Sequence, residues 1–313
     1  MIRVELAELE RRLLKVVSMS GFALKIAAIY AALALAVVSN AAGRSEYLMP
    51  EIKEIVRIGT PSGSGTGTIY SKAIIDGTPW VSVITAEHVV PNNNVTMRFG
   101  AAGGTAYAVD PTKIYRGGHT GNLDIAVAWF ALDLATFNTL TPKTLMLAPG
   151  AGAMFSDLGR GNTGSEKWVG GEWVGYNNAG TFGTLRFANN SIRTIGTTAM
   201  DWTNSDPRTG FAVSGEGPSW SGDSGSSYFA SSAIDVSTSL GTFSVFTDGI
   251  IGIHAWGERN SDGSKDWGFL SGGTPMSQPV LDWAHSVAAV PEPATLAALG
   301  LGMVALMRRK RQV

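Results

Sequence analysis

The sequence predicts an all-β protein, and three observations lead to that expectation. Glycine, serine and threonine are abundant between the two ends of the 313-residue chain. Short runs of β-branched and aromatic residues alternate with these small residues, which is typical of strands joined by turns. Apolar residues recur at helical spacing in few places, so little of the chain is expected to be helical.

The expected strands follow one another along most of the chain, and no internal repeat relates them. Trp80 to Thr85 shows the pattern well, because it is an alternating run rich in β-branched residues. In chain order, the expected strands are Glu54 to Arg57, Thr66 to Ser71, Trp80 to Thr85, Val95 to Phe99, Ile125 to Phe130, Gly183 to Phe187, Ser227 to Phe229, Thr242 to Phe246, Gly249 to His254 and Gly268 to Ser271.

One helix is expected after the last strand, over Pro279 to Val287. Ser277 is a suitable N-cap for it, and its apolar residues lie at helical spacing. A stretch rich in proline and glycine near 141–152 indicates a linker between two β units. We therefore place the first unit at 43–145 and the second unit, which includes the helix, at 146–289.

The N-terminal residues 1–42 have the pattern of a signal peptide. An apolar run, Ile26 to Val38, follows Lys25 and precedes small residues that suit cleavage by signal peptidase after Ala41 or Ala42. This run is short for a membrane span. The pattern therefore predicts an exported protein with signal peptidase as a partner, and a buried core helix is the alternative.

The C-terminal residues 290–313 combine a Val-Pro-Glu-Pro stretch, an apolar run from Leu296 to Met307 and the basic run Arg308 to Arg311. The prolines keep the first part extended, the apolar part reaches into a bilayer, and the basic residues favour the cytoplasmic face. This arrangement resembles the bacterial PEP-CTERM sorting signal. The resemblance implies transient membrane association and a sorting machinery that releases or anchors the protein outside the cytoplasm, in the periplasm, at the cell surface or in the medium. An ordinary tail anchor is the alternative.

The charge between these two ends argues against nucleic acid as a partner. The whole chain has 24 basic and 25 acidic residues, and the part between the two signals has 15 and 21, a net charge of about −6 with histidine neutral. Such a protein lacks the basic balance typical of nucleic-acid-binding domains. The chain has no cysteine, and its length is sufficient for a core without disulfides.

Three short motifs point to nucleophilic catalysis. Gly222-Asp223-Ser224-Gly225 is a turn that presents the Ser224 hydroxyl outward and directs the Gly222 and Ser224 amides at one point, as an oxyanion hole requires. Since a serine hydroxyl is a poor nucleophile at neutral pH, it needs a base and a carboxylate that orients the base. The candidates are His88, at the end of Thr85-Ala86-Glu87-His88, and Asp124, within Asn122-Leu123-Asp124-Ile125-Ala126. A polar turn without catalysis is the alternative for the Gly-Asp-Ser-Gly run taken alone.

The three residues resemble the catalytic triad of trypsin/chymotrypsin-like serine endopeptidases, and the resemblance covers about Ile55 to Val287. Each residue lies beside an expected strand, and the chain order is His, Asp, Ser. The resemblance implies that His88 is the general base, Asp124 the orienting carboxylate and Ser224 the nucleophile. The amides of Gly222 and Ser224 would then form the oxyanion hole.

The same resemblance implies a fold and a place for the site. Two six-stranded antiparallel β-barrels are expected, with the active site in the cleft between them and the terminal helix on the second barrel. His88 and Asp124 would come from the first barrel and Ser224 from the second. An insertion such as Ser231 to Gly241 could cover the cleft. The peptide chemistry needs no cofactor.

The segment Gly252 to Gly257 corresponds to the family strand that walls the primary specificity pocket. In the glutamyl endopeptidase branch, a histidine at the position of His254 helps to bind a substrate carboxylate, assisted by a hydroxyl group that Ser219 could supply. A buried carboxylate needs charge-assisted donors, so cleavage after Glu or Asp is expected. A core histidine bonded to the backbone is the alternative. The predicted substrate-binding residues are Ser219, His254, Ala255, Trp256 and Gly257.

Some features of the family are missing from the sequence. No Ile-Val-Gly-Gly activation terminus is present, so insertion of a new N-terminus beside Asp223 is not assumed. Ala255 stands where many relatives have a serine that supports the catalytic carboxylate, which leaves the support of Asp124 open. Pro218 stands where trypsin-like relatives carry an acid, which argues against basic specificity.

Three further features are interpreted as structural. The loop Glu258 to Asp266 is expected to be a hairpin tip, and a calcium loop is the alternative; no metal is expected. His119 is expected in a loop and His285 on the terminal helix. The expected function is an exported endopeptidase that cleaves protein or peptide through a covalent acyl-enzyme. A catalytically inactive protein of the same fold that only binds, at a surface or in a matrix, is the alternative, and an esterase with the same triad is a third.

Overall fold

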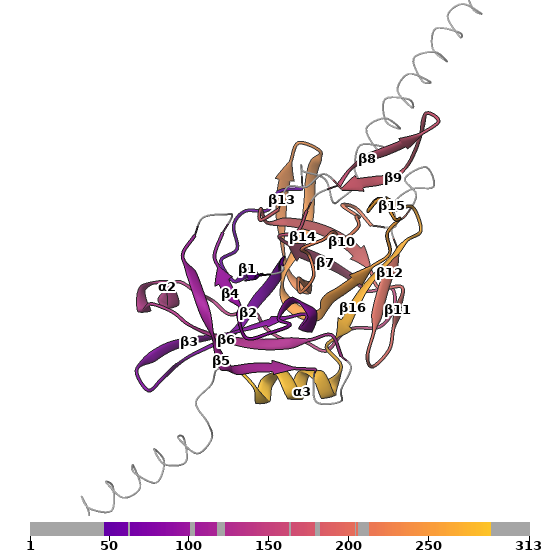
Figure 1. Cartoon of the computed structure of the whole chain (residues 1–313). Coiled ribbons are helices and arrows are strands. Elements are labelled where there is room, and N and C mark those ends of the chain that lie inside the picture. The colour runs from indigo at the N-terminus through magenta and orange to yellow at the C-terminus, as the bar shows by residue number, and fades with distance from the viewer. Residues whose placement is uncertain are drawn as a thin grey trace, which may run out of the picture. The chain divides into compact units, whose positions relative to one another are not determined.

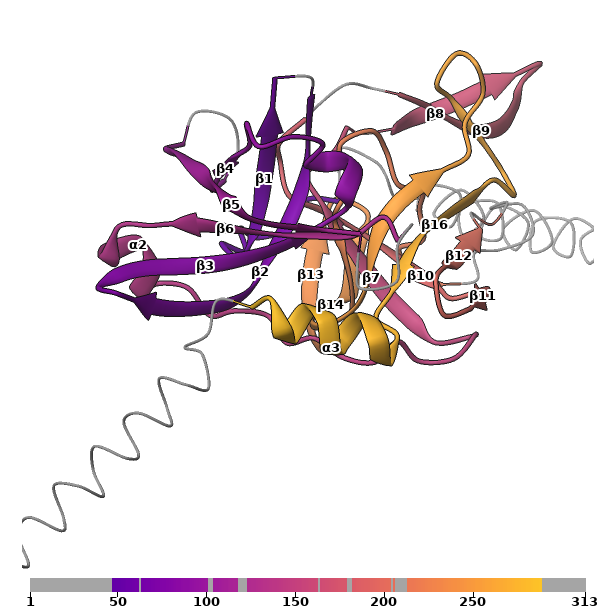
Figure 2. The ribbon, with the colours of Figure 1, turned by 60° about the horizontal axis from the view of Figure 1, so that its bottom comes forward.

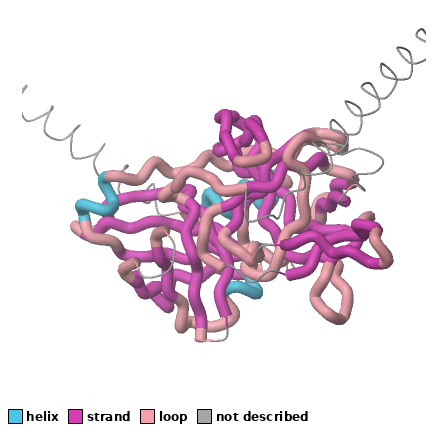
Figure 3. The backbone as a smooth tube through the Cα atoms, turned by 90° about the horizontal axis from the view of Figure 1, so that it is seen from above, coloured by secondary structure: helices cyan, strands magenta, loops and turns pink. Residues whose placement is uncertain are grey.

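The computed structural model describes residues 47–61, 63–100, 104–117, 123–162, 164–178, 182–203, 205 and 213–288. Strands make up most of this backbone, and its helices are short (Figure 3). The predominance of β structure is therefore confirmed. Within these ranges no helix is both long and apolar enough to cross a membrane. The predicted signals at 1–42 and 290–313 lie outside the described residues.

The first half of the described chain forms a closed antiparallel barrel with the strand order β1-β2-β3-β6-β5-β4 (Figure 1). Both faces of its third strand carry buried apolar side chains, such as Val81 and Val83 on one face and Ile84 on the other. The hairpin between the second and third strands turns at Asp76 and Gly77, whose positive φ angles, 49° and 77°, match a tight hairpin turn. The strands are β1 Ile55–Thr60, β2 Gly63–Ile75, β3 Thr78–Thr85, β4 Thr96–Arg98, β5 Ala106–Arg116 and β6 Ala126–Ala131.

The second half forms a seven-stranded sheet with the order β10-β7-β13-β14-β16-β12-β11. The ladder does not close among the described residues, so the second of the two expected barrels is not shown. Beyond its pairing with β7, β10 has only isolated bridges, from Arg186 to Leu48 and from Asn189 to Glu216, and no described strand joins it to β11 at the opposite edge. The strands are β7 Met154–Gly159, β10 Arg186–Ser191, β11 Thr194–Ile195, β12 Met200–Thr203, β13 Ser227–Thr238, β14 Gly241–Gly257 and β16 Leu270–Pro275.

A smaller sheet has the order β15-β9-β8. Its hairpin joins β8 Gly164–Val169 to β9 Glu172–Asn178 through Gly170 and Gly171, both with positive φ. The third strand, β15 Lys265–Asp266, pairs with β9 so that Lys265 lies opposite Tyr176. This long-range pairing fixes the position of Lys265, which lies in the pocket described below.

The terminal helix α3, Gln278–Ser286, begins one residue before the expected start and has Ser277 at its N-cap position. The hydrogen bonds that tie its C-terminal end to other elements come from the first barrel, whereas packing on the second unit was expected. Tyr70 Oη donates to Ala284 O at 2.7 Å, and Trp129 Nε1 donates at 2.8 Å to the carbonyl that follows the helix. Figure 1 shows α3 beside β5 of the barrel, and Figure 2 shows the helix from another side. The end of the chain therefore returns to the first half of the fold.

Several strands were not among those that the sequence pattern predicts, namely β5, β7, β8, β9, β11, β12 and β15, and the same holds for the short helix α2 Leu134–Asn138. The two strands expected at 242–246 and 249–254 form one continuous strand, β14. The segment 231–241, interpreted as an insertion, pairs with β14 as the outer part of the β13–β14 hairpin. It is therefore part of the sheet and not a separate flap.

Two polar residues fix the barrel against the seven-stranded sheet. Arg160, fully buried just after β7, donates from Nε to Ile55 O at 2.8 Å, and its Nη2 contacts Glu51. The side-chain hydroxyl of Thr66, on β2, accepts from Arg160 N at 3.0 Å and donates to Gly222 O at 2.9 Å. Both bonds of this hydroxyl group cross from the barrel to the second half of the chain. They hold the Gly-Asp-Ser-Gly turn at the edge of the barrel.

We expect Gly225→Ala to destabilise the fold by about 3 kcal/mol or more, and Gly77→Ala by only about 1 kcal/mol. Both glycines have positive φ, 82° and 77°, so both variants carry similar backbone strain. A Cβ at Gly225 would lie well under 3.0 Å from Thr85 Oγ1 and Thr66 O, whereas one at Gly77 meets no described atom within 4 Å. Urea unfolding would measure both losses. Equal losses would show that the close approach of the turn to β2 and β3 is unimportant.

Candidate active site

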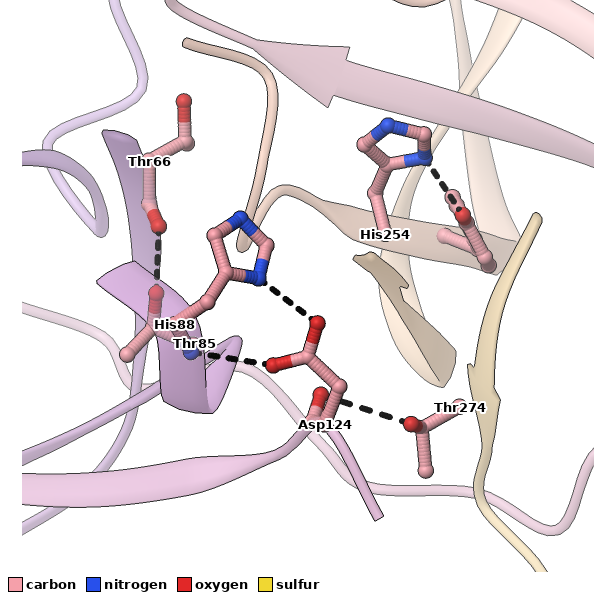
Figure 4. A network of polar contacts seen from close by, with 7 residues as sticks. Thr66, Thr85, His88, Asp124, His254 and Thr274 are labelled. Carbon is pink, nitrogen blue, oxygen red and sulfur yellow. Dashed lines mark hydrogen bonds and ion pairs between the residues drawn. The ribbon is translucent and has the colours of Figure 1, made fainter. Parts of the chain in front are cut away.

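His88 and Asp124 form a hydrogen-bonded pair at the edge of the barrel. His88 lies in the short 3₁₀ helix η1, Glu87–Val89, which follows β3, and Asp124 lies two residues before β6. The ring Nδ1 of His88 is 2.6 Å from Asp124 Oδ2, and the His88 amide donates to Oδ1 at 3.0 Å (Figure 4). Because β3 and β6 are neighbours in the barrel, residues distant in sequence meet here. The two side chains remain accessible to solvent, with exposed fractions of 47% and 33%.

The environment of Asp124 favours its ionised form. Burial tends to raise the pKa of this carboxyl, but hydrogen bonds from the ring and amide of His88, with smaller contributions from the His88 charge and the Glu87 amide, outweigh burial and lower the pKa below 3.8. An ionised carboxylate at Nδ1 keeps the histidine proton on that nitrogen. Nε2 is then the basic nitrogen. The pair therefore has the arrangement that a general base and its orienting carboxylate require.

The second sheet supports Asp124 through its backbone. Thr274 of β16 donates from Oγ1 to Asp124 O at 3.3 Å (Figure 4). The carboxylate itself is held by the ring and amide of His88 and by the Glu87 amide. Ala255 offers no hydroxyl group, and no serine hydroxyl reaches this carboxylate within the described residues. Asp124 is thus held by η1 and by a threonine that sequence reasoning did not single out.

The Ser224 turn lies against the segment that carries His88. Thr66 N donates to Ser224 O at 2.9 Å. A Cβ at Gly65 would lie 2.7 Å from Ser224 O and 2.7 Å from a Val89 methyl group. Glycine at this position of β2 therefore lets the nucleophile turn and η1 approach each other. The structure thus places the Ser224 turn beside η1, the segment that carries His88.

The turn leaves two amides available for a substrate oxygen. Gly222 has φ +93°, and Asp223 N closes the turn by donating to Trp220 O at 2.9 Å. Within the described residues, neither the Gly222 amide nor the Ser224 amide donates to a protein acceptor. The Ser224 hydroxyl and His88 are likewise not hydrogen-bonded to each other in the described part of the chain. Catalytic hydrogen bonds of this kind are often formed only when substrate is present.

The carboxylate of Asp223 anchors the same turn from inside the fold. Its Oδ1 accepts from Gly161 N at 2.8 Å, and its Oδ2 accepts from Trp220 N at 2.7 Å. Burial raises its pKa to about 6 despite these hydrogen bonds. Asp157 lies near it, and burial and the Asp223 charge raise the pKa of Asp157 well above 3.8. The amides of Gly161 and Trp220 therefore hold the turn through this carboxylate.

We expect the stability of the wild-type protein relative to Asp223→Asn to decrease as the pH rises from 4 to 7. The pKa of Asp223 is about 6 in the folded protein and near 3.8 in the unfolded chain, so the folded state binds the proton more tightly and loses stability as the carboxyl ionises. Urea unfolding at each pH should show a change of a few kcal/mol.

Asp110→Asn is the control for this comparison. Hydrogen bonds from Thr112 and Lys113 lower the pKa of Asp110 below 3.8. This carboxyl is therefore fully ionised above pH 5, and the difference in the free energy of unfolding between the wild-type protein and Asp110→Asn should be constant there. A constant difference for Asp223→Asn as well would contradict a buried, proton-binding carboxyl at this turn.

A pocket of about 260 Å³ opens beside Ser224. Its walls come from the turn before the nucleophile, the end of β14 and the loop that leads to β15. All the residues predicted to bind substrate line this one pocket together with Ser224, namely Ser219, His254, Ala255, Trp256 and Gly257. Their contact with substrate stays a prediction.

His254 is a neutral, buried member of this pocket. It is 3% exposed, and its Nδ1 lies 2.8 Å from Tyr228 Oη (Figure 4). Burial, with the nearby Lys265 charge, lowers its pKa to about 3. Since the fully buried phenol of Tyr228 has no other described acceptor, we assign its proton to this bond, which leaves the imidazole proton on Nε2. The side chain is thus bonded to a tyrosine and not to the backbone.

Lys265 is a pocket residue that sequence reasoning missed. It is 5% exposed, and its Nζ donates to Glu258 O at 2.9 Å. Burial lowers its pKa to about 8. The sequence shows only a lysine in a polar loop, and the pairing of β15 with β9 is what brings it to the pocket. No local pattern marks such a residue.

The remaining sequence expectations concern loops and histidines outside the site. In the loop 258–266, Asn260 N donates to Ser264 O at 2.8 Å, which closes a turn as a hairpin tip would. Within the described ranges, no group of three or more potential ligands of the His, Cys, Asp and Glu types comes together. His285 lies exposed on α3. His119 lies outside the described residues.

Comparison with known proteins bears on the C-terminus. Residues 289–312 match the family profile described as the PEP-CTERM protein-sorting motif. The predicted resemblance of 290–313 to this signal is therefore confirmed. The match indicates export, sorting at the bacterial cell surface and a sorting machinery as partner. No curated protein matches the chain.

Proposed function

We propose that this protein is an exported serine endopeptidase that hydrolyses peptide bonds through Ser224, His88 and Asp124. The observation that carries the proposal is the doubly bonded His88–Asp124 pair beside the Ser224 turn. One closed barrel next to an antiparallel sheet is compatible with a chymotrypsin-like arrangement, in which the sheet takes the place of the second barrel. A protein that only binds its partner has no physical need for this combination of groups.

The chemistry follows from the positions of these groups. Ser224 Oγ attacks the substrate carbonyl carbon while His88 Nε2 accepts the hydroxyl proton, and Asp124 stabilises the resulting imidazolium. The Gly222 and Ser224 amides donate to the oxyanion that forms. His88 then gives its proton to the leaving amine, and the peptide bond breaks to leave an acyl-enzyme. Water, activated by His88, hydrolyses this ester and regenerates Ser224.

The pocket beside Ser224 supports acid preference before the scissile bond. His254 and Ser219 line it as neutral polar groups, and the Ser219 hydroxyl donates to Ser271 Oγ at 3.1 Å. No acidic side chain lines this pocket within the described residues, so a basic substrate residue would find no counter-charge there. Cleavage after Glu or Asp is the specificity that this lining favours.

The proposal is tested by labelling and by cleavage. A serine-directed phosphonylating probe should label the purified protein at Ser224, and labelling should be lost in His88→Ala, which keeps the hydroxyl but removes the base. A diverse peptide library read by mass spectrometry should then show cleavage sites. Cleavage of ester substrates alone would favour an esterase. A folded protein that is neither labelled nor active would favour the inactive binding protein and refute the proposal.

A further inference from the structure

The pocket beside Ser224 contains a buried ammonium group with an incomplete set of acceptors. Lys265 Nζ carries three donors, and within the described residues its hydrogen-bond acceptor is one carbonyl, Glu258 O. No described carboxylate lies within 4.0 Å of it. The centroid of the Trp220 ring lies 6.0 Å from Nζ, at the limit of a cation–π contact, but a buried cation is costly unless it is paired with an anion. The missing partner is therefore expected to be an anion that enters from outside.

The charges around this ammonium exclude a cationic ligand. Arg259 is the other charged residue that lines the pocket, so both charged residues in the lining are basic. The neighbouring acids are turned to other partners, since Asp223 accepts from two amides and Glu258 Oε2 accepts from Leu270 N at 2.8 Å. The pocket thus presents net positive charge beside the nucleophile.

The space around Lys265 Nζ fits the end of a short side chain. A Cβ at Gly257 would lie 2.5 Å from Lys265 Nζ, 3.1 Å from Ser271 Oγ and 3.3 Å from Ser219 Oγ. Glycine at this position therefore leaves open the point at which one ammonium and two hydroxyl groups converge. A pocket of about 260 Å³ is smaller than typical sites for drug-sized ligands, so it suits a single side chain.

We propose that Lys265 binds the side-chain carboxylate of the substrate residue before the scissile bond. The Ser219 hydroxyl, which donates to Ser271 Oγ at 3.1 Å in the free protein, turns to donate to the same carboxylate. This inference rests on the proposed endopeptidase function and gives it a specificity determinant. His254 then acts as a neutral donor at the wall of the pocket, and the positive charge that selects Glu or Asp over Gln or Asn comes from Lys265.

The charge of Lys265 gives the proposal a second readout. Burial is the main cause that lowers the pKa of Lys265 to about 8, and the positive charge of Arg259 lowers it further. The negative charges of Asp223 and Glu258 raise this pKa but do not outweigh burial. His254 also faces Lys265 and is neutral. Lys265 is therefore charged below pH 8 and loses its charge as the pH rises through 8. The preference for Glu over Gln in kcat/KM, which reports the free enzyme, should decline over this range.

The test compares two peptides that differ only in Glu or Gln before the scissile bond, at pH 7. The wild-type protein should cleave the Glu peptide with a kcat/KM at least about 100-fold higher. Lys265→Met, which removes the charge and keeps the length, should lose most of this ratio by slowing Glu cleavage while Gln cleavage changes little. Lys113→Met, at a lysine paired with Asp110 on the barrel surface, is the control and should keep the full ratio. An unchanged ratio in a folded Lys265→Met protein would overturn the proposal.

A binding measurement separates this inference from the endopeptidase function. Short peptides that end in Glu or in Gln are titrated against the Ser224→Ala variant by calorimetry, which requires no turnover. Tighter binding of the Glu peptide, lost in Ser224→Ala with Lys265→Met, supports the carboxylate site even if the protein cleaves nothing. Equal binding of both peptides overturns the site even if the protein is a protease. Should Lys265→Met not fold, Gly257→Ala, which fills the same point with a methyl group, should give the same loss of Glu preference.

Discussion

Ser224→Ala is expected to lower kcat for peptide hydrolysis by about a millionfold, because it removes the atom that forms the acyl-enzyme. The fold should be unaffected, since no described hydrogen bond depends on the Ser224 hydroxyl and the turn is held through backbone groups and Asp223. Progress curves on a cleaved library peptide, with thermal unfolding of both proteins, measure the two effects.

Ser221→Ala provides a matched control for this change. Ser221 lies three residues before the nucleophile, lines the same pocket and is exposed. Its side chain has no role in the proposed chemistry, so the variant should cleave at close to the wild-type rate. Retention of activity in Ser224→Ala, or an equal loss in Ser221→Ala, would mean that the nucleophile is elsewhere.

Asp124→Asn is expected to lower kcat by about 10⁴-fold with little change in KM. In the wild-type protein, His88 Nδ1 lies 2.6 Å from a carboxylate oxygen of Asp124. The asparagine has nearly the same shape, but its amide group does not hold the proton on Nδ1. The imidazolium that forms during attack also loses its counter-charge. Steady-state kinetics over a range of pH would measure both effects, since the wrong tautomer weakens the base.

Asp133→Asn makes the same chemical change away from the site. Asp133 caps α2 by accepting from Thr136 N at 2.7 Å, so this variant should lose some stability and keep the wild-type kcat. An Asp124→Asn protein that works within tenfold of the wild-type rate would show that His88 acts as a base without its carboxylate.

The strand β5 shows why part of the fold escaped prediction. Its sequence, Ala106 to Arg116, contains Asp110 and Pro111, which normally argue against a strand. In the structure the register between β5 and β6 shifts between Val109 and Ile114, so the proline falls in a bulge where no ladder bond is required. The pattern rule was sound, and the bulge is a long-range feature that only the partner strand reveals.

The β8–β9 hairpin was missed for a different reason. Gly170 and Gly171 lie between two short runs that contain tryptophan and valine, and both have positive φ, 61° and 85°. A Gly-Gly pair in this setting is a recognised hairpin signal, so this element could have been predicted from sequence. The closure of a second barrel could not be predicted in this way. It depends on which strand pairs with β10, and no local sequence signal specifies that pairing.

The site residues also fall into two groups, those that a local motif indicates and those that only long-range strand pairing places. Ser224, His88 and Asp124 could be proposed from sequence because each lies in a short motif whose local geometry serves the chemistry. Lys265 and Thr274 could not, because they reach the site through β15–β9 and β14–β16 pairing between distant segments. Residues placed by tertiary pairing leave no periodic or spacing signal in the chain.

The docking of α3 has a mechanical consequence. Tyr70 and Trp129 hold carbonyls at the end of this helix, and the sorting motif begins at residue 289, three positions after the helix ends at Ser286. So short a stretch cannot act as a flexible tether. A pull on the motif is therefore transmitted to the barrel itself.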